Sequence, residues 1–320
     1  MVSKMPKSSL PWWAKVNPFV KSSARNQGFT LIELLIAMIV GSIIIGSLLY
    51  VVVELLQINR REELLTQTQQ DMRRAIDYIT RDTSEAIYVY ADPTDITDQI
   101  TDPPQNNPPA IPVLAFWRLD PLSDAELEAI AAVTCTGETA SRCETLRVRQ
   151  STYTLVVYYY LENQPNSDIL WEGPARIVRY ELPQYVNLRN AANRFAQRTG
   201  YNDPSLTDNF AEWARSGATT DGIKAVLTDS IAEGDDDLTC PADYRFNANA
   251  PSSFYTCVLV GETLDDVGVL SGTNQSMRVF LQGNAETNRF GITAFSESGK
   301  LPALESEVLI RGVLQRQPGS

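Results

Sequence analysis

One apolar segment constrains this chain more than any other feature. It runs from Phe29 to Val53 and contains a single charged side chain, Glu33. As an α-helix it would be about 37 Å long, which is enough to cross a hydrocarbon core of about 30 Å. The sequence therefore predicts a membrane-spanning helix at residues 29–53.

Charge is distributed unequally around this segment. Residues 1–28 contain five basic side chains and no acidic one, whereas the rest of the chain carries 22 basic against 39 acidic side chains. Basic residues collect on the cytoplasmic side of a membrane, so we expect the N-terminus in the cytoplasm and the acidic bulk outside it. An ordinary secretory signal is disfavoured, because its apolar region is shorter and a small-residue cleavage site follows it.

Composition excludes several classes of function. The chain of 320 residues has no histidine and a net charge of −12. The lack of histidine excludes Ser-His-Asp and Cys-His catalysis and histidine-ligated zinc. The negative charge disfavours phosphate backbones, so we expect no nucleic-acid partner. Catalysis by carboxylates and oxygen-ligated calcium remain open.

Glu33 needs a partner, because a carboxylate inside a bilayer costs a few kcal/mol or more. If the chain is cut after Gly28, Phe29 gains an α-ammonium group close to that carboxylate. Glu33 can then pair with the N-terminus of a neighbouring subunit when the helices bundle, and so set the register of an assembly. The alternative is a plain signal anchor with a stray glutamate.

The run from Gly28 to Glu33 reads GFTLIE and follows a basic segment. It resembles the class III signal of the type IV pilin superfamily. The resemblance implies that a prepilin peptidase removes residues 1–28 by cutting between Gly28 and Phe29, and that Phe29 is N-methylated. It implies an assembly role for Glu33 and a structural subunit rather than an enzyme. The implied partners are other pilins or pseudopilins, contacted through the N-terminal helix, the prepilin peptidase and an inner-membrane assembly platform. The head would be periplasmic before assembly and part of an extracytoplasmic filament afterwards.

Shorter segments resemble particular subunits of this superfamily. Residues 71–82 are similar to the post-membrane helix of PilW/PulJ-like minor subunits, and residues 86–90, 278–285 and 308–314 to cyanobacterial pseudopilins of hormogonium polysaccharide secretion. These resemblances imply a minor pilin or pseudopilin that serves polysaccharide export and gliding motility. A bulky head favours a place at or near the filament tip, because it is hard to repeat along a tightly packed filament. The alternatives are a type IV pilus minor pilin for adhesion, twitching or DNA uptake, and a membrane-anchored extracytoplasmic hydrolase or binding protein.

The helix should continue beyond the membrane, because no proline occurs between Phe29 and Asp92. Residues 54–86 are amphipathic, and the charged residues, Asp82 among them, lie largely off the apolar stripe. That stripe consists of Leu55, Ile58, Leu65, Met72, Ile76 and Ile79. Residues 87–320 should form a sheet-rich head with an insertion near 184–250. The predicted class is α+β and pilin-like, with a long N-terminal helix packed on an antiparallel-sheet head.

Local patterns predict the elements of the head. A helix is expected at 123–133, with Ser123 and Glu126 placed as a capping box, and a loop at 92–112. Residues 187–232 have a helix-like composition. Strands are expected at 86–90, 113–119, 147–161, 169–171, 175–182, 255–261, 276–281, 290–294 and 307–314.

Four cysteines and one acidic run complete the candidate sites. Because all four lie on the extracytoplasmic side, Cys135, Cys143, Cys240 and Cys257 favour two disulfides, for which three connectivities exist. The local one pairs the first two and the last two; free thiols are an alternative, and a metal site is disfavoured by the spacing. The run Asp235, Asp236 and Asp237 offers weak calcium ligands, but it lacks the spacing of an EF-hand loop, so a solvated acidic loop is favoured and no cofactor is expected.

Overall fold

A computed structural model describes residues 29–105, 107–164, 171, 173–207, 210–234, 238–259, 276–285 and 299–310. The chain divides into two units, Met1–Asn59 and Arg60–Ser320. Helix α1 (Leu31–Ser84) begins in the first unit and ends in the second. The helix ends at Ser84, two residues before the predicted boundary at residue 86.

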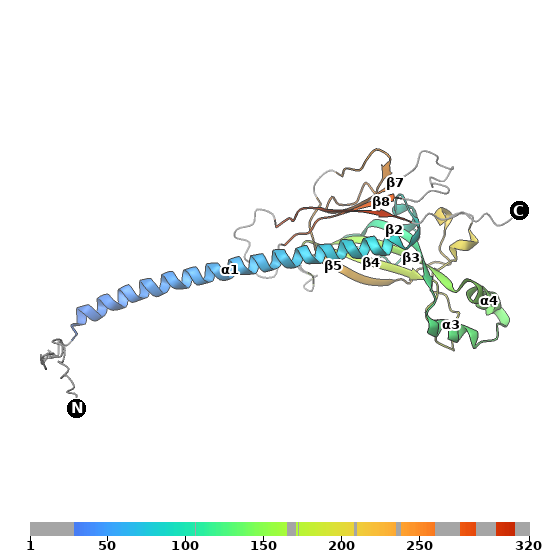
Figure 1. Cartoon of the computed structure of the whole chain (residues 1–320), viewed down its shortest axis with the longest axis horizontal. Helices are drawn as coiled ribbons and strands as arrows, with labels where there is room; N and C mark the ends of the chain where they lie inside the picture. Colours follow the sequence, from blue (N-terminus) through green and yellow to red (C-terminus); the bar gives the residue numbers. More distant parts are fainter. Residues whose placement is uncertain are drawn as a thin grey trace, which may run out of the picture. The chain divides into compact units, whose positions relative to one another are not determined.

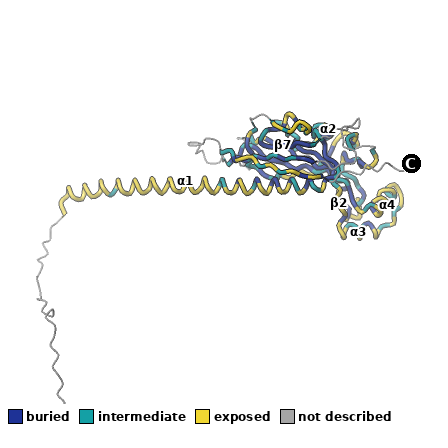
Figure 2. The backbone as a smooth tube through the Cα atoms, turned by 45° about the horizontal axis from the view of Figure 1, so that its top comes forward, coloured by how far each residue is buried: buried dark blue, intermediate teal, exposed yellow. Residues whose placement is uncertain are grey.

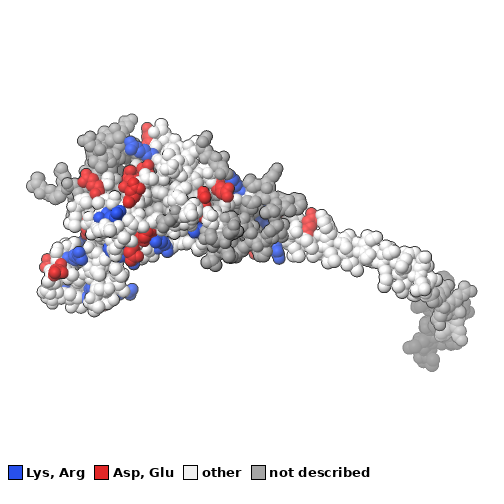
Figure 3. Space-filling view, turned by 180° about the vertical axis from the view of Figure 1, so that it is seen from behind, with Lys and Arg blue, Asp and Glu red and all other residues white. Residues whose placement is uncertain are grey.

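The first unit is the apolar part of α1. Between Phe29 and Asn59 every residue is exposed except Gly41, which is partly covered (Figure 2). Glu33 and Glu54 are the charged residues of this segment, and Figure 3 shows it as a nearly white surface. A helix satisfies its own backbone hydrogen bonds in lipid, and the lack of proline in this segment permits a continuous one.

The second unit contains the C-terminal part of α1 and two antiparallel sheets (Figure 1). The first sheet has the strand order β1-β2-β3-β4-β5, and every strand pairs with its neighbour in sequence. Its strands are β1 (Ala86–Val89), β2 (Ile111–Pro121), β3 (Ser151–Glu162), β4 (Ala175–Pro183) and β5 (Ile223–Ile231). The strand β3 is central and almost wholly buried, which explains its dense apolar and aromatic sequence.

The second sheet has the order β6-β7-β8-β9. Its strands are β6 (Tyr244–Arg245), β7 (Phe254–Leu259), β8 (Ser276–Leu281) and β9 (Leu304–Leu309). An antiparallel bridge between Ile231 and Gly283 joins the end of β5 to the segment after β8. The side chain of Thr256 also donates to the carbonyl of Val113, across the two sheets.

Two buried clusters follow from the alternation of side chains along the first sheet. On β3, Tyr158 belongs to a core that α1 and both sheets share, whereas the next residue, Tyr159, belongs to a second cluster. The second cluster is aromatic and includes Trp117, Tyr201 and Trp213. The predicted α+β class, with a long helix packed on an antiparallel-sheet head, is therefore confirmed.

A two-helix lobe interrupts the β2–β3 hairpin. The strands end and restart opposite each other, with Pro121 paired to Ser151. Between them lie α3 (Asp124–Ala131), the 3-10 turn η2 (Gly137–Thr139) and α4 (Ala140–Arg149). Ser123 and Glu126 form the predicted capping box on α3. Helix α4 was not predicted, and the expectation of a strand from residue 147 was wrong for residues 147–150, because Gln150 caps α4 and β3 begins at Ser151.

Other expectations also need correction. The predicted loop at 92–112 contains a helical turn, α2 (Thr94–Thr97), and the start of β2. The helix-like composition of residues 187–232 does not correspond to an α-helix. This stretch contains two 3-10 turns, η3 (Pro204–Leu206) and η4 (Phe210–Glu212), and then strand β5. The expected strand at 290–294 and most of that at 169–171 lie outside the described residues.

Candidate processing and assembly site

The first turn of α1 carries the residues on which processing and assembly would depend. The helix begins at Leu31, and the carbonyl of Thr30 accepts hydrogen bonds from the amides of Glu33 (3.1 Å) and Leu34 (3.2 Å). The hydroxyl of Thr30 also accepts from the Glu33 amide (3.3 Å). Phe29 precedes the helix and is 82% exposed.

Glu33 lies in this first turn with an exposed side chain. A carboxylate at a helix N-terminus is favoured by the helix dipole, and it is accessible here to a second chain. Gly28 lies outside the described residues, so the scissile bond is placed only by the position of Phe29. Cleavage, N-methylation and the register role of Glu33 remain predictions.

The remaining part of the first unit presents an apolar surface suited to lipid or to other helices. Helix α1 is long and apolar enough to cross a membrane, and none of its most apolar window is buried within the chain. The hydroxyls of Ser42 and Ser47 donate to the carbonyls of Ile39 (2.8 Å) and Ile44 (2.9 Å). These bonds satisfy the two polar groups within the helix itself, as an apolar environment requires.

The second unit holds its part of α1 by a narrow stripe of buried residues. They are Thr68, Met72, Ala75, Ile76, Ile79, Asp82 and Thr83. The predicted stripe is therefore right at Met72, Ile76 and Ile79, whereas Leu55 and Ile58 are exposed. Gly283 permits the close approach, because a Cβ atom there would lie 2.7 Å from the Cγ of Met72.

Asp82 is the residue that the sequence placed wrongly. It was expected off the apolar stripe, but its side chain is only 4% exposed. It accepts hydrogen bonds from Arg179 Nε (2.7 Å), Arg179 Nη2 (3.1 Å) and the Tyr158 hydroxyl (2.6 Å), and a further one from Arg118. The signal was its spacing: Asp82 follows Ile79 by three residues and so continues the buried stripe.

The partners of Asp82 come from three strands of the first sheet, β2, β3 and β4. Arg118 also binds Asp120, and both arginines contact Glu181. Burial lowers the pKa of Arg179, but the hydrogen bonds and charge of Asp82 outweigh burial and raise it. Burial, followed by the charge of Asp82, raises the pKa of Tyr158. The cluster therefore holds charged arginines and a neutral tyrosine whose hydroxyl donates a hydrogen bond to the carboxylate.

A second carboxylate fastens the loop after α2 to strand β5. Asp102 accepts hydrogen bonds from Tyr180 (2.8 Å), from the Gly222 amide (3.0 Å) and from Thr220, and it pairs with Lys224 (3.2 Å). Burial acts to raise the pKa of Asp102, but these hydrogen bonds, led by that of Thr220, lower it. The ionised form of Asp102 is thus favoured by folding.

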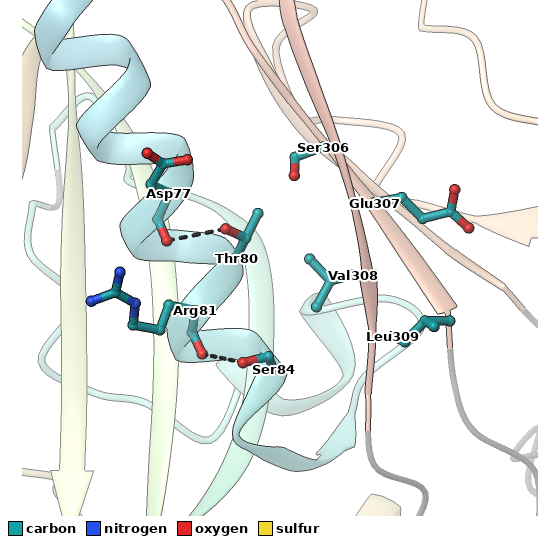
Figure 4. A pocket seen from close by; sticks show the side chains of 8 residues that line it. All are labelled: Asp77, Thr80, Arg81, Ser84, Ser306, Glu307, Val308 and Leu309. Carbon is teal, nitrogen blue, oxygen red and sulfur yellow. Dashed lines mark hydrogen bonds between the residues drawn. The ribbon is translucent and has the colours of Figure 1, made fainter.

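Two shallow grooves flank α1 in the second unit. One, of about 550 Å³, lies between α1 and β9, and the other, of about 430 Å³, lies between α1 and β5. In Figure 4 the side chains of Ser306 and Val308 point towards α1, whereas Glu307 and Leu309 point away from it. Thr80 and Ser84 donate to carbonyls of their own helix at 3.0 and 2.7 Å, so they line the first groove without reaching across it.

The four cysteines form two disulfides, Cys135–Cys143 and Cys240–Cys257. This is the local connectivity of the three that the sequence allowed. The first bond closes the lobe around Cys143 and Leu146, and the second joins β7 to the segment before β6. The weak calcium candidates Asp235, Asp236 and Asp237 lie outside the described residues. Within the described part of the chain, no group of three or more His, Cys, Asp or Glu residues is placed to hold a metal ion.

Comparison with known proteins gives one match. Residues 23–49 match the family model described as the prokaryotic N-terminal methylation motif. No curated protein and no solved structure matches the chain. The matched residues include Phe29 and Thr30, which directly precede α1, and the first turns of the helix, where Glu33 lies. The chain thus carries a prokaryotic N-terminal methylation motif on a long apolar helix, which is the signature of a type IV pilin-like precursor.

Proposed function

We propose that this chain is a minor pilin or pseudopilin. A prepilin peptidase cuts the precursor between Gly28 and Phe29, and the new N-terminus on Phe29 is methylated. The mature subunit leaves the membrane by entering a short filament that drives secretion. The observation that carries this proposal is the methylation motif at 23–49, which coincides with the start of an exposed apolar helix.

Within this proposal, Glu33 has one role. Its carboxylate pairs with the α-ammonium group of Phe29 on a neighbouring subunit as the helices bundle, so the apolar surfaces join in a single register. The exposed position of Glu33 in the first turn of α1 supports the role, because a second helix can reach it. The function is structural rather than catalytic, and it requires no cofactor.

The head supports a position at or near the filament tip. It carries a two-helix lobe that interrupts the β2–β3 hairpin, and this lobe adds bulk to the sheets. Such a head is easier to place once at an end than to repeat at every subunit. Antibody labelling of filaments is expected at their ends, and labelling along their whole length would exclude this position. We favour polysaccharide as the cargo and its export, with gliding motility, as the role. Loss of exported polysaccharide in a deletion strain tests this role.

The register role is tested by Glu33→Ala in the full precursor. We expect cleavage to continue and incorporation into filaments to fail, because the helix loses its pairing group but the residues flanking the scissile bond stay the same. Glu54→Ala is the matched control: it removes an exposed acid from the same helix, 21 residues further along. Normal assembly of Glu33→Ala, or equal loss of assembly in both variants, would refute the role.

A further inference from the structure

Thr30 has the geometry of a helix N-cap. It lies outside α1, its carbonyl accepts the first helical hydrogen bond from Leu34, and its hydroxyl accepts from the amide of Glu33. Threonine is a favoured residue at this position because its side-chain oxygen can accept from an amide of the first turn; here the Glu33 amide is shared between the carbonyl of Thr30 (3.1 Å) and its hydroxyl (3.3 Å). The spacing of Thr30 and Glu33 is also that of a capping box. The hydroxyl of Thr30 therefore favours a helix that begins at Leu31 and not earlier.

The place where α1 begins matters for the chemistry of processing. In the hydrolysis, water adds to the carbonyl carbon of Gly28, the C–N bond to Phe29 breaks, and the amine of Phe29 takes up a proton. In a helix that began a turn earlier, the same carbonyl would accept the amide hydrogen of Ile32, four residues on. That hydrogen bond and the surrounding turn would have to open before a peptidase could hold the bond in an extended conformation.

Without a cap, α1 is expected to extend towards the N-terminus. Adding a residue to an existing helix is far easier than starting one, and amides without partners are costly next to lipid. The sequence before the scissile bond offers Ser23 and Asn26 as other capping residues, although Gly28 opposes a helix. The start of α1 is thus a competition, in which the hydroxyl of Thr30 favours Leu31.

We infer that Thr30 is a positioning residue for processing: its hydroxyl caps α1 two residues beyond the Gly28–Phe29 bond and keeps that bond out of the helix. The inference rests on the proposed function, because it concerns the same cleavage. Thr30 would act on the conformation of the precursor itself, before the peptidase binds.

The test compares initial cleavage rates of the full precursor in detergent micelles with a purified prepilin peptidase. Thr30→Val keeps the shape of the side chain but loses the oxygen, and Thr30→Ala loses both. Thr30→Ser and Thr30→Asn keep an oxygen that can cap. We expect the first two to be cut roughly fivefold more slowly, and the last two to stay within about twofold of the wild type. A wild-type rate for Thr30→Val would overturn the inference. So would slow cleavage of the serine and asparagine variants, because the peptidase would then be recognising the threonine itself.

A second measurement follows the helix without the peptidase. Amide hydrogen exchange of the precursor should show greater protection at Ile32 in Thr30→Val than in the wild type, with Leu34 unchanged as the internal control. Equal protection of Ile32 in both proteins would overturn the inference. If the wild-type chain is not cut between Gly28 and Phe29 at all, the proposed function fails, and the exchange experiment still decides whether Thr30 sets the start of α1.

Discussion

The substitution Asp82→Asn should detach the end of α1 from the first sheet. It keeps the size of the side chain but removes a charge that two arginines share. Asp82 accepts four hydrogen bonds, two of them from Arg179 and one each from Arg118 and Tyr158. The side-chain amide of the asparagine would also place an N–H donor against the N–H groups of the arginines and the hydroxyl of Tyr158.

The magnitude follows from burial and from the remaining partners. Hydrogen bonds to a charged group contribute about 1.5–3 kcal/mol each, so their simple sum would exceed the true effect. Arg118 retains Asp120, and both arginines retain Glu181. We therefore expect the value typical of a broken buried ion pair, about 3–5 kcal/mol. For a head of this size, the melting temperature should fall by roughly 6–20 °C.

Thermal unfolding of the full chain in detergent, followed by near-ultraviolet circular dichroism, measures this loss. The buried aromatic side chains of the head, Tyr158 among them, report on its packing. Asp77→Asn is the matched control, because Asp77 is an exposed acid on the same helix and its substitution should cost less than about 0.5 kcal/mol. If Asp82→Asn unfolds within that margin of the wild type, the cluster does not anchor α1.

Three further perturbations test the head. Gly283→Ala should destabilise the head by about 1–3 kcal/mol, because the new methyl group meets Met72. The double variant Gly283→Ala with Met72→Ala should lose less free energy of unfolding than the two single variants lose together. Strict additivity in unfolding experiments would contradict the close packing. Replacing Cys240 and Cys257 by serine should cost about 3 kcal/mol, because the bond closes a loop with a sequence separation of 17, and an unchanged denaturation midpoint would refute this. The lowered pKa of Asp102 means that its contribution to stability is present above the ordinary value of 3.8 and is lost as the pH falls through the folded value. Stability should therefore fall more between pH 5 and pH 2 in the wild type than in Asp102→Asn, and identical pH profiles would show that Asp102 contributes nothing.

The helix was the most predictable part of the chain. Its length follows from local properties: a long apolar segment, an amphipathic continuation, and no proline between Phe29 and Asp92. The capping box of α3 and the bounds of β8 were predictable for the same reason, since each depends on residues close together in sequence.

The errors arose where distant partners decide the structure. The β-favouring run at 147–161 suggested a strand from its first residue, but burial of Cys143 and Leu146 on one face makes residues 147–149 the end of α4. Strand β5 has a mixed composition and is held by its pairing with β4. The spacing of Asp82 from Ile79 places it on the buried face, but its partners Arg118, Tyr158 and Arg179 are 36 to 97 residues away, and the local sequence does not identify them.

In the candidate site, the sequence identified Phe29 and Glu33 by their motif but gave no account of Thr30. Its role depends on where α1 begins, which is a property of the backbone. The local disulfide connectivity was one of three possibilities, and the fold selects it by bringing the two cysteines of each pair within 5.6 and 5.8 Å between Cα atoms.

Removal of residues 1–28 and methylation of Phe29 are decided by the N-terminus of the protein isolated from its own membranes and filaments. Mass spectrometry of the N-terminal peptide is the measurement. We predict a mature chain that begins at Phe29 with a methyl group on its α-amino nitrogen, and the loss of that form when the prepilin peptidase is removed. A chain in filaments or membranes that still carries residues 1–28, with the peptidase present and active on another precursor, would contradict this prediction.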